Sequence, residues 1–127
     1  MIIAPLDLSL AEAIDQLRQE NAGFMALVDD RGQLVGVFTE TDILSKIACK
    51  VEDLAQARVK DYMSANVTVL KAEATIAQAL HLMSIHRFRH IPLVDDDGKP
   101  DGVISSRSII HYLETKFPMT DEPVSTH

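Results

Sequence analysis

Residues 27–43 of the chain read LVDDRGQLVGVFTETDI, and residues 93–109 read LVDDDGKPDGVISSRSI. Both stretches belong to a longer internal repeat, because residues 6–44 align with residues 72–110 at a constant offset of 66 without a gap. Two copies are too few to build a stable solenoid. The sequence therefore predicts one compact body whose two halves are related by a pseudo-two-fold axis and leave clefts between them.

Each copy has the pattern of an extended lead-in followed by helix, strand, hairpin turn, strand and helix. The first helix begins at a capping-box pair, Ser9 and Glu12 in copy one and Thr75 and Gln78 in copy two. The expected strands are residues 24–28, 34–38, 90–94 and 101–104, the Asp-rich turns are residues 29–32 and 95–98, and the second helices lie near residues 40–49 and 106–116. The predicted fold class is α+β, with two β-α-β-β-α units.

We expect the first repeat to occupy residues 1–50 and the second residues 67–117. Residues 51–66 contain no glycine or proline and are interpreted as a structured, partly helical connector. Residues 118–127 hold two prolines and little apolar content, which predicts a disordered tail. Within the predicted strands, Gly36 and Gly102 indicate the close approach of another backbone or of a ligand.

The composition excludes several classes of protein. A formal net charge of −7 argues against a general nucleic-acid surface, because such surfaces need clustered Lys and Arg. No apolar run approaches the roughly 18 residues of a membrane span, and the N-terminus lacks a basic signal-peptide start. The single cysteine, Cys49, excludes an intramolecular disulfide and suits a reducing compartment. We therefore expect a cytoplasmic protein with no nucleic-acid or membrane partner.

Four short motifs mark the duplicated unit: GVFTETD at residues 36–42, VKDYM at 59–63, VTV at 67–69 and RFRHIPLVD at 87–95. Together they make the chain resemble a tandem pair of CBS domains, the regulatory module named after cystathionine β-synthase. The resemblance covers roughly residues 2–115. It implies two repeats packed sheet to sheet with pseudo-two-fold symmetry, and an adenosine-containing ligand in a cleft between them. The module is expected to stand alone, without a fused catalytic domain.

The resemblance assigns Thr39 and Asp42 to ribose recognition, with the Asp42 carboxylate accepting hydrogen bonds from the 2′- and 3′-hydroxyls. Taken by themselves, these residues are typical of a helix start, where threonine caps and an acidic side chain suits the dipole. The resemblance also assigns phosphate contacts to Arg89 and His90, and Arg107 is expected to point toward the same cleft. Alone, these basic side chains would suit a solvated helix end equally well.

The second copy departs from the motif, because Ser108 stands where the first copy has Asp42. A serine cannot hold a diol through two acceptor oxygens. The opposite cleft would pair Ser108 with Gly23 and Phe24, so it lacks both the ribose acceptor and the basic residues. One nucleotide site per chain is therefore expected.

An apolar slot is needed for the base. Val37 and Phe38, Val67 and Thr68 are the candidates for its walls, and Phe88 for one edge. Each of these residues suits plain core packing about as well, because buried apolar side chains are the norm in strands.

Other constellations of reactive residues are not supported. His81 and His86 are five residues apart and do not share a helix face, so no metal site is predicted. The sequence has no Ser-His-Asp order, phosphate-binding loop or dinucleotide fingerprint, so no catalytic residue and no required cofactor are predicted.

The predicted function is a non-catalytic regulatory module that binds an adenine nucleotide, AMP, ADP or ATP, and signals to an unknown effector protein. A homodimer through the repeat helices is the expected assembly, because the second helices carry more apolar positions than one packing stripe needs. The alternative is a scaffold that only mediates assembly and whose cleft is vestigial.

Overall fold

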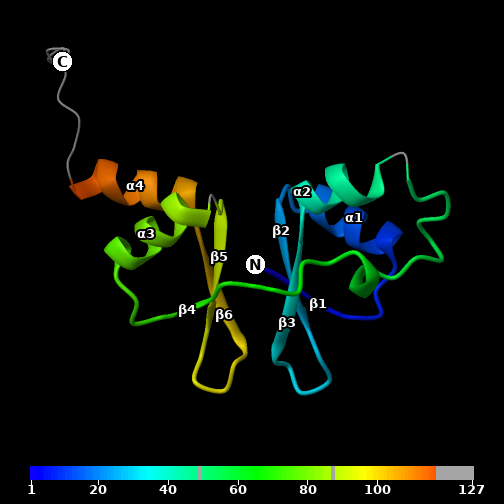
Figure 1. The fold of residues 1–127 in the computed structure, drawn as a ribbon, viewed down its shortest axis with the longest axis horizontal. Coiled ribbons are helices and arrows are strands. Elements are labelled where there is room, and N and C mark those ends of the chain that lie inside the picture. Colours follow the sequence, from blue (N-terminus) through cyan, green and yellow to red (C-terminus); the bar gives the residue numbers. More distant parts are fainter. Residues whose placement is uncertain (49, 87, 117–127) are drawn as a thin grey trace, which may run out of the picture.

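The computed structural model describes residues 1–48, 50–86 and 88–116. Two repeats with the same order of elements follow each other along the chain, joined by a connector (Figure 1). The first holds β1 (Ile2–Pro5), α1 (Leu10–Gln19), β2 (Phe24–Val28), β3 (Leu34–Thr39), α2 (Glu40–Asp42) and the helical turn η1 (Ile43–Ile47). The second holds β4 (Leu70–Lys71), α3 (Ile76–His86), β5 (His90–Val94), β6 (Pro100–Ser105) and α4 (Ser106–Lys116). The α+β prediction of two β-α-β-β-α units is confirmed.

Each repeat contains a three-stranded mixed sheet, in the order β1-β2-β3 or β4-β5-β6. The first pair of strands in each sheet is parallel and the second antiparallel. Even the irregularity repeats, because the register shifts after Leu27 in the first sheet and after Leu93 in the second. The constant offset seen in the sequence is thus a constant offset in strand register.

The Asp-rich turns form as their sequences predict. Oδ1 of Asp29 accepts hydrogen bonds from the backbone N–H groups of Arg31 and Gln33, at 2.9 and 3.0 Å. Asp95 makes the same pair of bonds in the second hairpin, at 2.9 Å each. Gly32 and Gly98 follow with φ values of 84° and 80°, a conformation that glycine adopts without steric cost.

The helices begin at the predicted caps. The Ser9 hydroxyl accepts the N–H of Glu12 at 3.1 Å, and Thr75 and Gln78 form a reciprocal capping box at 3.1 and 2.9 Å. The apolar stripe of α1 is buried against the first sheet, with Leu10 and Ala13 at 0% exposure. Burying such a stripe is what makes a helix of this length stable in a protein.

The second helix of the first repeat is less regular than predicted. A single α-helical turn over α2 continues into η1, where the N–H of Ala48 donates to the carbonyl oxygen of Ile43 at 2.9 Å, five residues back. Such a widened π turn is uncommon and is frequently found at functional sites. The predicted end of this helix at Cys49 and the predicted disordered tail at 118–127 lie outside the described residues, as does Arg87 of the RFRHIPLVD motif.

The connector is structured and packs on the first repeat. Backbone bonds join the N–H of Leu10 to Ala57 O and the N–H of Val59 to Leu8 O, at 2.9 and 2.8 Å. Its helical content is one 3₁₀ turn, η2 (Val59–Asp61), in which Val59 is completely buried. The connector is thus held to the first repeat by backbone hydrogen bonds and contains one helical turn.

The two sheets face each other in the middle of the molecule, with the helices on their outer sides and both hairpins at one end (Figure 1). Alternation along the strands explains the arrangement. Met25, Leu27 and Phe38 face the core of the first repeat, whereas Phe24 and Val37 form a smaller apolar cluster with Val67 and Val103 of the second. The site between the repeats is therefore built on the second face of the first sheet.

Candidate functional site

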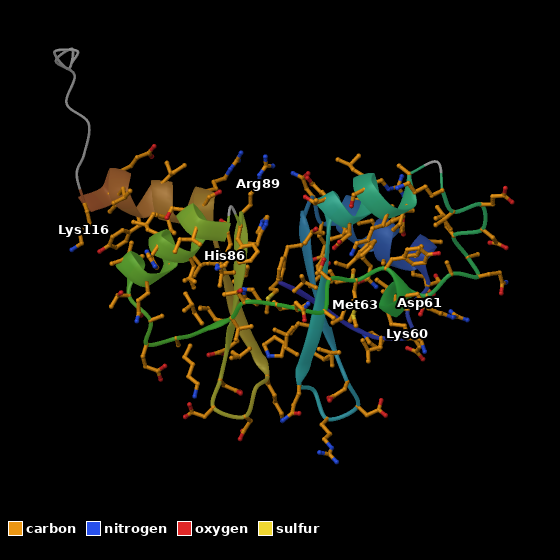
Figure 2. All side chains as sticks on the ribbon, viewed as in Figure 1. Lys60, Asp61, Met63, His86, Arg89 and Lys116 are labelled. Carbon is orange, nitrogen blue, oxygen red and sulfur yellow. The ribbon has the colours of Figure 1, made fainter. Side chains whose placement is uncertain are left out.

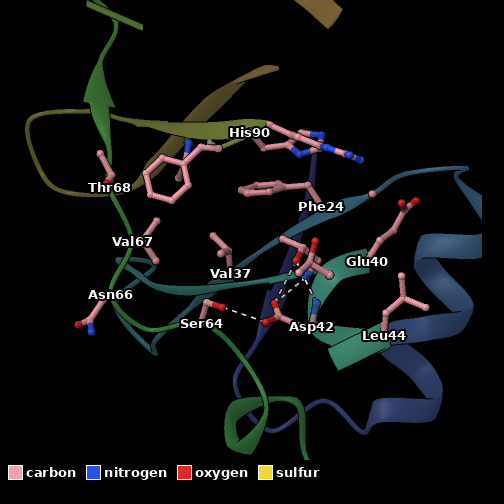
Figure 3. A pocket seen from close by; sticks show the side chains of 16 residues that line it. Phe24, Val37, Glu40, Asp42, Leu44, Ser64, Asn66, Val67, Thr68 and His90 are labelled. Carbon is pink, nitrogen blue, oxygen red and sulfur yellow. Dashed lines mark hydrogen bonds between the residues drawn. The ribbon is translucent and has the colours of Figure 1, made fainter. Parts of the chain in front are cut away.

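A cavity of about 520 Å³ lies between the two repeats (Figure 3). Four segments line it: residues 23–24 at the start of β2, residues 37–44 from the end of β3 to the start of η1, the stretch 64–68 that leads into the second repeat, and the stretch 88–92. Its size falls within the range of small-molecule sites in proteins. Both repeats and the connector therefore contribute residues to the lining of the cavity.

The cavity brings together eight of the ten residues predicted from the sequence. They are Val37, Thr39, Asp42, Val67, Thr68, Phe88, Arg89 and His90. Apolar side chains from β3 and the lead-in lie on one side, and basic residues lie at the start of β5 (Figure 3). The predicted convergence of these eight positions is present in the structure.

Phe38 and Arg107 are placed elsewhere. Phe38 is at 0% exposure in the core of the first repeat, because successive side chains of a strand point to opposite faces and its neighbour Val37 takes the cavity side. Arg107 is exposed on the first turn of α4 and is not part of the cavity lining.

The Asp42 carboxylate is the most constrained polar group of the cavity, at 3% exposure. Its Oδ2 accepts hydrogen bonds from the N–H and the hydroxyl of Thr39, at 2.9 and 3.2 Å. The Asp42 N–H in turn donates to Thr39 Oγ1 at 3.3 Å, which completes a capping box. Thr39 and Asp42 thus cap the helix, as their residue types alone indicate, and they also line the cavity.

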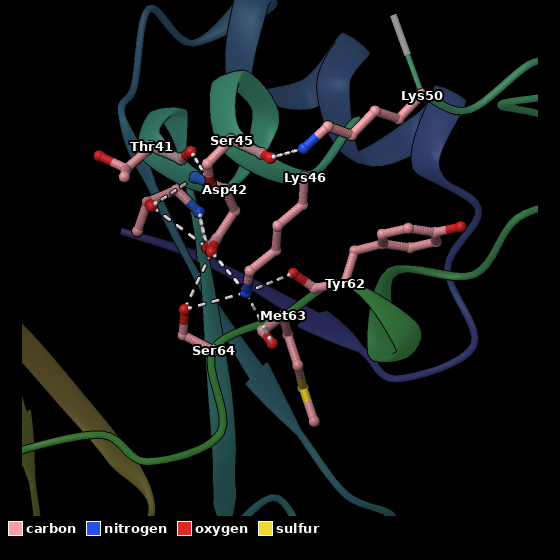
Figure 4. Close-up of polar contacts among 9 residues, drawn as sticks. Thr41, Asp42, Ser45, Lys46, Lys50, Tyr62, Met63 and Ser64 are labelled. Atoms are coloured by element: carbon pink, nitrogen blue, oxygen red, sulfur yellow. Dashed lines mark hydrogen bonds and ion pairs between the residues drawn. The ribbon is translucent and has the colours of Figure 1, made fainter. Parts of the chain in front are cut away.

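The other oxygen of Asp42 is tied to residues that the sequence analysis did not select. Oδ1 accepts a hydrogen bond from Ser64 Oγ at 2.9 Å and forms an ion pair with Lys46 Nζ, also at 2.9 Å (Figure 4). Lys46 stands four residues after Asp42, a spacing at which helical side chains meet, so a sequence signal for it existed. Ser64 had no such signal, because its position depends on the path of the connector.

Lys46 also joins the helix to the connector. Its Nζ donates to the carbonyl oxygens of Tyr62 and Met63 at 3.1 and 3.3 Å. Ser64 is held as well by two backbone bonds to Val37, at 2.8 and 3.0 Å. One ammonium therefore fixes the carboxylate and the connector wall of the cavity together.

The equivalent position of the second repeat is built differently. The hydroxyls of Ser105 and Ser108 bond to each other at 2.7 Å, and the Ser108 N–H donates to Ser105 Oγ at 3.0 Å. Neither serine lines the cavity. The second repeat therefore has no carboxylate in the position that Asp42 occupies in the first repeat.

Gly23 and Phe24 line the same cavity as Asp42 and Arg89. The prediction that they belong to the opposite cleft is therefore wrong. Phe24 and His90 are equivalent residues of the two repeats, and their rings stack with centroids 5.4 Å apart. Phe24 and His90 lie at the boundary between the two repeats. Both therefore line the same cavity instead of lining two separate clefts.

Charges of both signs surround the cavity. Burial lowers the pKa of half-buried His90, the nearby Glu40 carboxylate acts against this, and Arg89 adds to it. Arg89 is exposed at the helical end of the molecule, between the repeats (Figure 2). Among the ion pairs of the described residues, none involves Glu40 or Arg89.

The remaining lining residues were also missed by the sequence analysis. They are Glu40, Thr41, Leu44, Asn66 and Pro92. Several are sequence neighbours of predicted residues, so extending each motif by one or two positions would have found them. Within residues 1–48, 50–86 and 88–116, no group of three His, Cys, Asp or Glu side chains could hold a metal ion. None of the helices in these residues combines the length and the hydropathy that a transmembrane helix requires.

Comparison with known proteins gives a consistent result. Residues 1–49 and 59–115 match the CBS domain family. An uncharacterized 17.7 kDa protein of Acidianus ambivalens is 28% identical over 84% of this chain and 63% of its own length. Inosine-5′-monophosphate dehydrogenase of Methanocaldococcus jannaschii is 31% identical over 91% of this chain but 22% of its own length. The chain spans less than two thirds of the length of the first curated relatives it matches.

Solved structures agree in fold. A CBS-domain containing protein from Agrobacterium tumefaciens superimposes with a TM-score of 0.79 at 28% identity, covering 88% of both chains. The CBS domain pair of protein MJ0100, solved in complex with 5′-methylthioadenosine and S-adenosyl-L-methionine, has a TM-score of 0.79 at 26% identity and covers 88% of this chain and 90% of its own. The chain belongs to the CBS domain family and is a tandem pair of CBS domains.

Proposed function

We propose that the chain is a regulatory module that binds an adenine nucleotide, AMP, ADP or ATP, in the cavity between its repeats and does no chemistry on it. The observation that carries the proposal is the joint placement of Asp42, an apolar wall and Arg89 around one cavity of about 520 Å³. A carboxylate suits a ribose diol, an apolar wall suits a base, and a guanidinium suits phosphate. Nucleotide binding needs these three chemistries within one cleft.

The structural neighbours support an adenosine ligand. The CBS domain pair of protein MJ0100 was solved with two adenosine derivatives, 5′-methylthioadenosine and S-adenosyl-L-methionine. The polar groups that would meet the common adenosine part, Thr39 and Asp42, are present in this chain. The number of phosphates that the ligand carries then depends on Arg89 and His90, which line the same cavity from the second repeat.

Within this proposal each of the eight predicted residues that line the cavity has a role. Thr39 and Asp42 bind the ribose, while Val37 and Val67 contact the base. Thr68 and Phe88 lie at the rim of the base slot. Arg89 and His90 face the phosphates, and the change in packing between repeats is passed to a partner protein in the cytoplasm.

The second candidate function is a scaffold that mediates assembly. Exposed apolar side chains on the helices favour it: Leu44 is 75% exposed, Ile110 57% and Ile85 56%. Exposed apolar groups on a helical face mark sites of protein association. We propose that the helical surface that carries Leu44, Ile85 and Ile110 forms a homodimer under both candidate functions. The two functions therefore differ in whether the cavity binds a ligand.

A thermal-shift panel tests the proposed function. The panel contains AMP, ADP, ATP, NAD, S-adenosylmethionine and GTP. A ligand at 100 times its Kd adds about 2.7 kcal/mol, which shifts the Tm of a chain of this size by roughly 10 °C. Stabilisation by adenine nucleotides but not by GTP supports the proposal. If no ligand of the panel shifts the Tm at millimolar concentration, the result would contradict the proposal and favour the scaffold function.

A further inference from the structure

The Asp42 carboxylate has no acceptor position to spare. Its two oxygens accept from four donors: the N–H and hydroxyl of Thr39, Ser64 Oγ and Lys46 Nζ. An ionised carboxylate offers about four lone-pair sites. A ribose diol donates two hydrogen bonds, so two of the present donors must leave before it can bind in the proposed manner.

The donors differ in how easily they can leave. Both Thr39 donors belong to the cap that starts α2, where the Thr39 N–H at 2.9 Å is a backbone group that moves only if the helix start opens. Ser64 and Lys46 contact Oδ1 through side chains alone. A hydroxyl can turn about one bond, and a lysine stem is flexible.

Lys46 also has other partners to turn to. The carbonyl oxygens of Tyr62 and Met63 lie 3.1 and 3.3 Å from its Nζ, and its side chain is 39% exposed. An ammonium that leaves Asp42 therefore stays hydrogen-bonded and hydrated. Displacing it therefore does not leave an unpaired ammonium buried.

We propose that Lys46 and Ser64 compete with the ribose of the ligand for the Asp42 carboxylate and thereby set how tightly the cavity holds a nucleoside. The inference rests on the proposed function, because it concerns how the same cavity takes a ribose. Ligand binding exchanges two internal hydrogen bonds for two external ones. The same exchange breaks the hydrogen bond between Ser64 of the connector and Asp42 of α2, so ligand binding also weakens the attachment of the connector to this helix start.

The chain offers a matched set of variants (Figure 4). Lys46→Met and Ser64→Ala each remove one competing donor. Lys50→Met and Ser45→Ala are the controls, because Lys50 Nζ donates to Ser45 O at 2.7 Å and Ser45 Oγ donates to Thr41 O at 2.7 Å, away from Asp42. The probes are adenosine, which carries the diol, and 2′,3′-dideoxyadenosine, which does not.

Titration calorimetry reads the affinities. Each test variant should bind adenosine about three- to tenfold more tightly, the size expected for one competing hydrogen bond, with dideoxyadenosine unchanged. The two controls should match the unmodified chain with both probes. Lys46→Met leaves a carboxylate of 3% exposure without its cation, so Ser64→Ala carries the test if that variant does not fold.

Three outcomes would count against these proposals. Weaker adenosine binding in Ser64→Ala would show that Ser64 positions Asp42 for the ligand, and it would overturn the competition. Equal changes for adenosine and dideoxyadenosine, or no change at all, would overturn it too while leaving the proposed function in place. Failure of the unmodified chain and of every variant to bind either adenosine or AMP at millimolar concentration would overturn the proposed function itself.

Discussion

The rings of Phe24 and His90 stack across the boundary between the repeats, with centroids 5.4 Å apart and planes 27° from parallel. The two residues hold the same position in the two copies, each paired with the last residue of the neighbouring strand, Thr39 or Ser105. Two equivalent residues touch only if they lie near the axis that relates the copies. The stack therefore marks the pseudo-two-fold axis at one wall of the cavity.

Stability should fall in mild acid because of His90. Burial lowers the pKa of this imidazole below its ordinary value of 6.5, so the unfolded chain takes up the proton at a higher pH than the folded chain. The stabilisation by neutral His90 is fully present above pH 6.5 and is lost as the pH falls toward the lowered pKa. Urea unfolding from pH 7.5 to 5 measures the loss.

The control for this prediction is a second histidine. His90→Gln should flatten the decline of the free energy of unfolding with falling pH, whereas exposed His111→Gln should keep it. A decline of equal steepness in the unmodified chain and His90→Gln would contradict the assignment.

Gly36→Ala should destabilise the fold. A Cβ at this position would lie 2.9 Å from the carbonyl oxygen of Ser64 and 2.6 Å from the sulfur of Met63, where the connector crosses β3. Overpacking of this kind costs about 1–3 kcal/mol. Gly23→Ala is the comparison, because its Cβ would meet the flexible carboxylate of Glu40 at 3.2 Å. Denaturant midpoints should fall clearly more for Gly36→Ala, and a smaller loss there would contradict the close approach.

The chain should be a dimer at micromolar concentration. Ile110 and its counterpart Leu44 are 57% and 75% exposed, and Leu113 is 37% exposed where its counterpart Ile47 is 4%. Ile110→Glu places a charge in this face and should give a monomeric mass by light scattering. Ile3→Glu, at a 50% exposed position of β1, should leave the mass unchanged. A monomeric mass for the unmodified chain would contradict the proposed homodimer.

Arg89→Ala should weaken phosphorylated ligands selectively. A guanidinium–phosphate contact is worth enough that its loss should reduce AMP affinity by about tenfold. Adenosine affinity should hardly change, because adenosine carries no phosphate. Arg31→Ala, in the exposed β2–β3 turn, is the matched control. Equal losses for AMP and adenosine would show that Arg89 supports the cavity rather than the phosphate.

Much of the fold could be predicted from the sequence because local signals and the repeat agreed. The Asp-rich turns, the caps at Ser9 and Thr75 and the strand pattern each specify local structure without help from tertiary contacts. The π turn of η1 could not be predicted, because its sequence has the same apolar spacing as an ordinary helix. The spacing of apolar residues also gives no sign of tertiary contacts such as those between Lys46 and the connector.

The site residues that lie in sequence motifs could be predicted. Those that reach the site only through the path of the folded chain could not. Thr39, Asp42 and Arg89 lie in motifs, and the structure brings them to one cavity. Phe38 was placed wrongly in the base slot although strand periodicity excludes two adjacent residues from one wall. Ser64 could not be found, because only the folded connector sets it beside Asp42.

The central claim is that each chain holds one adenosine site and that Asp42 governs it. Titration calorimetry with AMP measures both the number of sites and the affinity, for the unmodified chain, Asp42→Asn and Ser108→Ala. Asp42→Asn keeps the shape of the side chain but removes its charge and one of its two acceptor oxygens, and the loss of one charge-assisted hydrogen bond predicts binding roughly 10- to 100-fold weaker. Ser108→Ala should bind as the unmodified chain does, with one AMP per chain. Two equivalent sites per chain, or an equal loss in Ser108→Ala, would contradict the account.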